Sequence, residues 1–240
     1  KGRIYDIGSK EMGMEAEAHS SPFEVAEGKK FIPFRIITPD VSDHLYRSEG
    51  KGSFQIVSVR LAGKMPEIDH CDQLVNAHVL SIDAKLHGAQ LKLPWNLPTF
   101  EDLHGQLLYQ KGHLYFKEIE GRIFHSTLEK VNGAFYELLH IPTLQMDCQG
   151  KFDLTDLPLL LKTEGFPEEF SRALSSINIL SGKATYSLSA KGFLKPPIRF
   201  QHQGTYRLSK THFTHQQIPF PIQIGEGRVD LSHKDLQWSE

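Results

Sequence analysis

Apolar and polar residues alternate along most of this chain, a pattern typical of β-strands that bury one face. The segments expected to be strands on this basis are 54–61, 80–86, 89–93, 184–190, 198–200 and 206–208. An extra residue at Val57 predicts a β-bulge, and Gly204 predicts a bulge or a bend between the last two segments. Glycine–lysine steps at 111–112, 182–183 and 191–192 are expected to be turns.

One spaced pattern occurs twice, more than a hundred residues apart. In both copies apolar residues follow a glycine by two, four, nine and eleven positions, starting at Gly105 and at Gly227. The apolar residues are Leu107, Tyr109, Leu114 and Phe116 in the first copy, and Val229, Leu231, Leu236 and Trp238 in the second. The pattern predicts two β-hairpins of one design, and therefore a sheet assembled by repetition.

Other segments depart from alternation. Residues 167–177 carry apolar side chains at helical spacing after Pro167, which predicts a short amphipathic helix. A second short helix is expected at 71–79. Residues 10–21 are acidic and rich in small residues, so we expect an irregular or partly exposed segment, whereas 31–37 has strand character. The whole pattern predicts a mainly β, antiparallel fold with one or two short helices.

No shift in composition marks a firm domain boundary. The 240 residues could form one large β domain or two smaller ones. We therefore interpret 1–240 as a single β-rich segment, with 1–97 and 98–240 as candidate sub-units. The chain begins at Lys1 without Met and ends just after the second hairpin, so we expect it to be part of a longer protein.

Charge argues against some partners. Lys and Arg number 27 and Asp and Glu 29, with no long run of one sign. Nucleic-acid binding normally needs a basic stripe, so no nucleic-acid partner is expected. No stretch approaches the roughly 18 apolar residues of a membrane helix. Cys71 and Cys148 leave two alternatives open, a disulfide or two separate thiols.

No catalytic or metal site is expected. The 13 histidines do not join cysteines or carboxylates at ligand spacing. The serine-nucleophile, phosphate-loop and paired-cysteine motifs are absent. We interpret the close carboxylate pairs as side chains on solvated strand faces and not as a general acid and base. The sequence thus predicts a protein that is not an enzyme and needs no cofactor.

The function is therefore sought in the apolar faces of the strands. These faces either form the closed core of a sandwich or line an open groove, because period 2 reports a buried face without saying what covers it. Few helices are available to cover a long sheet. Besides the hairpin residues, Tyr186, Leu188 and Phe200 are candidate groove positions.

A resemblance to a known family sharpens this choice. Residues 103–123 resemble a recurring unit of bacterial AsmA-like proteins, with leucines around a glycine (Leu103, Gly105, Leu107), a short turn, then leucine–x–aromatic and a further glycine. Segments 150–157 and 182–188 are similar to other lines of that family. The resemblance covers roughly residues 80–240.

The resemblance implies a curved, taco-shaped sheet with an apolar interior. It implies a parent protein anchored in the inner membrane that crosses the periplasm and guides phospholipid acyl chains towards the outer membrane, in support of outer-membrane biogenesis. The partners expected are phospholipid or other lipid chains. The alternative kept open is a β-sandwich module that scaffolds envelope proteins.

Overall fold

The computed structural model describes residues 1–24, 27, 50–92, 98–162, 175–193, 199–232 and 236–239. The strands are β1 (Gly2–Tyr5), β2 (Gly13–Ala18), β3 (Phe23–Glu24), β4 (Gly50–Lys64), β5 (Leu80–Lys92), β6 (Thr99–Gln110), β7 (His113–Ile123), β8 (Ser126–Tyr136), β9 (Thr143–Asp153), β10 (Ile177–Phe193), β11 (Arg199–His215), β12 (Ile218–Ser232) and β13 (Leu236–Ser239). The short helices are α3 (Met65–Asp69), η3 (Leu74–Val79), η4 (Leu154–Asp156) and α4 (Leu157–Leu160).

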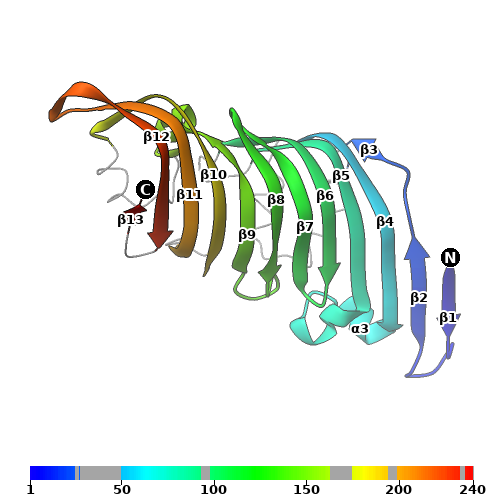
Figure 1. The fold of residues 1–240 in the computed structure, drawn as a ribbon. Helices are drawn as coiled ribbons and strands as arrows, with labels where there is room; N and C mark the ends of the chain where they lie inside the picture. Colours follow the sequence, from blue (N-terminus) through cyan, green and yellow to red (C-terminus); the bar gives the residue numbers. More distant parts are fainter. Residues whose placement is uncertain are drawn as a thin grey trace.

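All the described strands belong to one open antiparallel sheet. Twelve of them follow one another in chain order, and β3 pairs with β4 beside this path. Figure 1 shows β4 to β12 side by side, each bent over at one end, so that the sheet curves like a trough with the two termini at opposite ends. The mainly β, antiparallel prediction is confirmed. Strands β5 and β6 pair across position 97, and the division into sub-units stays a prediction.

Both predicted hairpins form, with the same cross-strand relationship. The partners are Tyr109 with Leu114 and Leu107 with Phe116 in β6–β7, and Leu231 with Leu236 and Val229 with Trp238 in β12–β13. The turn of the first hairpin is the predicted Lys111-Gly112 step, with φ of 52° and 77°. Positive φ at both central residues is the type I′ geometry that matches strand twist.

The bulge prediction holds at Val57, where the register of β4 against β5 shifts between Ile56 and Ser58. At Gly204 no bulge forms, because this residue stays in register with both neighbouring strands, and the alternative of a bend stays a prediction. The turns expected at 182–183 and 191–192 are also wrong, because both steps lie inside β10. Gly182 instead coincides with a register irregularity of that strand, where φ is 146°. Gly182 therefore marks a local distortion of the strand and not a turn.

The remaining local predictions have mixed outcomes. Residues 10–21 were expected to be irregular or partly exposed; 13–18 form β2, whose positions after Gly13 are partly or fully exposed. The second short helix is the 3₁₀ helix η3. The predicted helix at 167–177 lies mostly outside the described residues, although its last position, Ile177, begins β10. The strand expected at 31–37 lies wholly outside them. Cys71 and Cys148 are both free thiols.

Two buried clusters form the hydrophobic core of the β4–β8 part of the sheet. The first lies where α3, η3 and the segment after β8 close one end of the strands, and consists of Val79, Leu80, Tyr109 and Leu138. The second lies over β5–β7 and consists of Ala89, Leu103, Phe116 and Ile119. Each large apolar side chain buried in this way contributes about 1.5–3 kcal/mol. The β4–β8 part of the sheet therefore has an ordinary packed core.

Candidate functional site

Cross-strand pairing places the predicted groove positions whose side chains the structure describes on one face of the sheet, here called the apolar face. Partners in a regular ladder point to the same side, as do residues two apart on one strand. The rows on this face are Tyr109–Leu114–Phe135–Leu144–Gly192–Phe200; Leu107–Phe116–Gly133–Met146–Ala190–His202; Val131–Cys148–Leu188–Gly204–Leu231–Leu236; and Leu128–Gly150–Tyr186–Tyr206–Val229–Trp238. For Phe200, Leu236 and Trp238 the structure describes the backbone but not the side chain.

Burial divides the apolar face into two parts. Tyr109 and Phe116 are each 8% exposed, which places them in the core clusters. On β10–β12 the large apolar side chains are only partly buried, and these residues are Tyr186, Leu188, Tyr206, Leu208, Val229 and Leu231. The accessible candidate surface is therefore the β10–β12 part of the face, and the aromatic residues of the first hairpin belong to the packed part.

Two tyrosines stand at the centre of the accessible part. The rings of Tyr186 and Tyr206 are stacked, with centroids 6.1 Å apart and 29° between their planes. The Tyr186 hydroxyl donates to the carbonyl oxygen of Thr127 at 3.3 Å and lies 3.5 Å from the Cys148 sulfur. Burial raises the pKa of both tyrosines and of the Cys148 thiol. All three groups are thus uncharged at neutral pH, and this part of the face presents no charge from them to a ligand.

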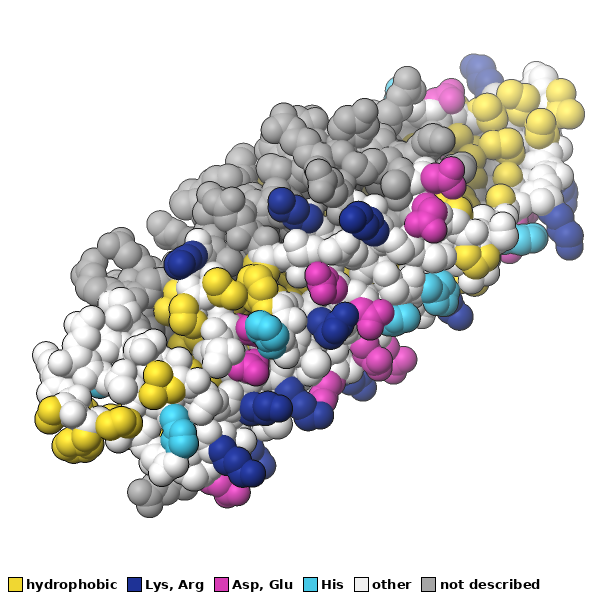
Figure 2. Space-filling model, turned by 90° about the horizontal axis from the view of Figure 1, so that it is seen from above, with side chains coloured by type: hydrophobic (Ala, Val, Ile, Leu, Met, Phe, Trp, Pro, Cys, Tyr) yellow, Lys and Arg dark blue, Asp and Glu magenta, His cyan; other side chains and the backbone are white. Residues whose placement is uncertain are grey.

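The opposite face, here called the polar face, has the chemistry of a solvated surface. Between the apolar rows, β10 and β11 carry Thr185, Ser187, Thr205 and Arg207 there. Ion pairs join neighbouring side chains, such as Lys151 with Glu129 at 2.5 Å. Figure 2 shows acidic, basic and histidine side chains interspersed on the surface seen from above. This mixture agrees with the absence of a basic stripe in the sequence.

A buried polar cluster ties the β7–β8 turn to η4. The Asp156 carboxylate is 1% exposed and accepts hydrogen bonds from the backbone N–H of His125 at 3.0 Å and from the Ser126 hydroxyl at 2.6 Å. His125 Nδ1 lies 2.7 Å from its other oxygen. A serine–histidine–aspartate hydrolase needs the serine bonded to the histidine. Ser126 bonds to Asp156 instead, so the cluster does not have the arrangement of such a triad.

The described residues contain neither a metal-binding cluster nor a helix that could cross a membrane. No group of three or more His, Cys, Asp or Glu side chains there is arranged to hold a metal ion. The helices that the structure describes include none long and apolar enough to cross a membrane.

Sequence reasoning missed several residues of the accessible surface. Tyr206 and Leu208 lie in a predicted strand but were not among the predicted groove positions, although they alternate with Thr205 and Arg207. Cys148 and Met146 also lie on the face, within a strand interrupted by polar residues and Gly150. Period-2 alternation through 144–152 was the signal that could have found them.

Comparisons of the chain with protein-family models, with curated protein sequences and with solved structures found no match.

Proposed function

We propose that the chain is a non-enzymatic β-groove segment that shields lipid acyl chains against the apolar face of its sheet. The proposal extends to phospholipid cargo, to a periplasmic location and to a parent protein anchored in the inner membrane, in line with the resemblance to AsmA-like proteins. On this proposal the protein guides lipids between the inner and outer membranes and contributes to outer-membrane biogenesis.

The observation that carries the proposal is the set of partly exposed apolar rows on β10–β12. There, Leu188, Tyr206 and Leu231 lie on adjacent strands, and the described residues provide no second sheet over them. A large contiguous apolar surface on a protein is typical of a binding site. The open, single-sheet arrangement also argues against the closed sandwich that the sequence left as an alternative.

Energetics favour acyl chains as the ligand. Burying one methylene group contributes about 0.8 kcal/mol, so a chain lying across several strands gains enough to leave water. The neutral tyrosines and thiol at the centre of the face impose no charge that a hydrocarbon would have to desolvate. A curved apolar face of this kind suits chains that slide along it.

Matched substitutions on two residues of β10 test the proposal. Leu188 lies on the apolar face, and Lys191 is an exposed residue on the polar face. We expect Leu188→Glu to abolish binding of a fluorescent fatty acid and co-purification of phospholipid in native mass spectrometry, while Lys191→Glu retains both. Circular dichroism and thermal unfolding establish that both variants are folded. Equal lipid binding by the two folded variants would contradict the proposal.

The scaffolding alternative has one supporting observation. His113, Tyr115 and Tyr136 form a group of edge-on rings with centroid separations of 5.4–6.2 Å. Their cross-strand positions put Tyr115 on the polar face, opposite Leu108 and Ala134. All three side chains are partly buried. Tyrosine is among the residues that most often carry the binding energy of protein interfaces. Loss of a co-purifying envelope protein from Tyr115→Ser, with lipid binding intact, would favour this function.

A further inference from the structure

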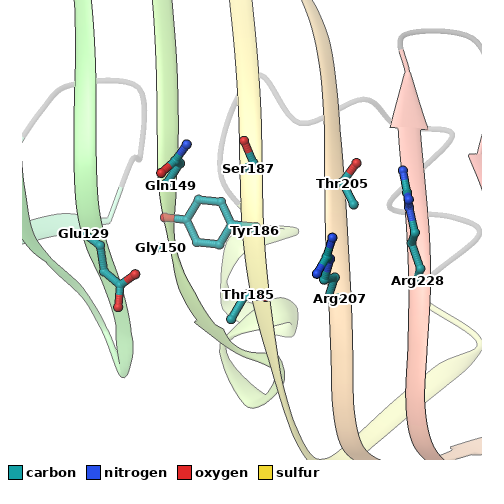
Figure 3. A pocket seen from close by; sticks show the side chains of 9 residues that line it. All are labelled: Glu129, Gln149, Gly150, Thr185, Tyr186, Ser187, Thr205, Arg207 and Arg228. Atoms are coloured by element: carbon teal, nitrogen blue, oxygen red, sulfur yellow. The ribbon is translucent and has the colours of Figure 1, made fainter.

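We propose that Arg207 and Arg228 form a binding site for a phosphate group on the polar face of β10–β12, separate from the apolar face. The site is a shallow depression of about 470 Å³ that reaches from β8 to β12. Figure 3 shows Arg207 and Arg228 on neighbouring strands at one side of it, with Thr185 and Ser187 on the next strand. The two arginines lie on the side of the sheet opposite the apolar face, although Tyr186 of the apolar face also lines the depression. The proposal does not depend on lipid binding by that face.

The two arginines are direct cross-strand partners in the register of β11 against β12. Like charges directly opposite each other destabilise a sheet, so such a pair needs compensation. Arg228 has it, because its Nε lies 2.8 Å and its Nη2 3.0 Å from the carboxylate oxygens of Asp230. Asp230 is held in turn by the Thr205 hydroxyl, which donates to it at 2.5 Å.

Arg207 has no such compensation. Within the described ranges its guanidinium makes no hydrogen bond or ion pair. The acidic residue lining the depression, Glu129, is already engaged by Lys151 at 2.5 Å. The depression therefore presents one fully available guanidinium beside a second that is only partly neutralised.

This arrangement matches the chemistry of a phosphate group. A guanidinium offers parallel N–H donors in a planar fork that fits two phosphate oxygens, and a bound anion relieves the repulsion between two adjacent arginines. The hydroxyls of Thr185 and Ser187 line the same depression and supply further donors.

Anion-dependent stability tests the site. Thermal unfolding is measured in sodium phosphate and in sodium chloride at equal ionic strength and pH, for the wild type, Arg207→Gln and Lys191→Gln. Lys191 is an exposed residue of β10 on the same face but outside the depression. We expect phosphate to raise the melting temperature of the wild type and Lys191→Gln alike. Arg207→Gln should bind phosphate about tenfold more weakly, the effect of losing a charged hydrogen bond.

Two further results are decisive. In chloride, Arg207→Gln should be at least as stable as the wild type, because the like-charge opposition is gone. Titration with sn-glycerol 3-phosphate distinguishes the source of the phosphate, since preferential binding of this probe points to a lipid headgroup and equal binding to the phosphate group alone. The same phosphate shift in Arg207→Gln and the wild type, no shift in either, or a clear loss of stability of Arg207→Gln in chloride would overturn the proposal.

Discussion

The ring of Tyr186 fills the space that a side chain at Gly150 would occupy on the neighbouring strand. A Cβ atom built at Gly150 would lie 2.8 Å from the Tyr186 hydroxyl oxygen and would also collide with the carbonyl oxygen of Thr127. The tyrosine hydroxyl donates to that same carbonyl. An aromatic ring packed over a cross-strand glycine is a known way to stabilise a curved sheet. This pair therefore links the curvature of β8–β10 to the tyrosines of the candidate surface.

Replacing Gly150 with Ala is expected to destabilise the protein by about 1–3 kcal/mol, since the added methyl group overpacks a filled site. Gly225 is the matched control, because a Cβ atom there meets nothing within 4 Å. Gly225→Ala should be neutral or stabilising by up to about 1 kcal/mol, as expected for a glycine removed from a strand. Urea denaturation measures both free energies of unfolding. Equal effects of the two substitutions would contradict the packing argument.

Asp156 should be sensitive to a nearly isosteric change. Its buried carboxylate accepts hydrogen bonds from the His125 backbone N–H and the Ser126 hydroxyl. In Asp156→Asn an amide NH₂ group replaces one acceptor, and the loss is expected to be about 2 kcal/mol of unfolding free energy. Asp72→Asn, at an exposed position, provides the control. An Asp156→Asn variant as stable as this control would show that the cluster does not hold the turn.

The same cluster predicts a pH dependence. The hydrogen bond to Asp156, and then its charge, raise the pKa of His125 above the ordinary value of 6.5. A raised folded-state pKa stabilises the protein below the unfolded value, and this contribution is lost as pH rises through the folded value. Between pH 6 and 9, wild-type stability should therefore fall relative to His125→Gln. Parallel stability profiles of the two proteins would rule out the linkage.

The buried hydroxyl of Tyr109 does not stabilise the described fold through a hydrogen bond. The side chain is 8% exposed, and its hydroxyl oxygen has no hydrogen-bond partner within the described part of the chain. Burial raises the pKa of Tyr109 to about 12. Because an unsatisfied buried hydroxyl costs about 1–3 kcal/mol, Tyr109→Phe should leave stability unchanged or raise it. A loss of more than about 1 kcal/mol on calorimetry would reveal a partner for this hydroxyl.

Local predictions are confirmed where the local structure depends on only a few neighbouring residues. The Lys111-Gly112 turn and the bulge at Val57 follow from neighbouring residues alone, and both form. The bulge expected at Gly204 and the turn expected at 191–192 do not form, because long cross-strand ladders on both sides hold these residues in extended backbone. A glycine read without its neighbours cannot distinguish a turn from a place where another side chain needs room.

The sequence by itself determined the antiparallel sheet, the two matching hairpins and the set of residues that share one face, because alternation with period 2 fixes the side of the sheet. Only the tertiary structure decided which of those residues are core. Tyr109 and Leu231 obey the same pattern, yet α3, η3 and the segment after β8 close over the first, while the second stays partly exposed. Period 2 records which way a side chain points, and what covers it depends on segments distant in the chain.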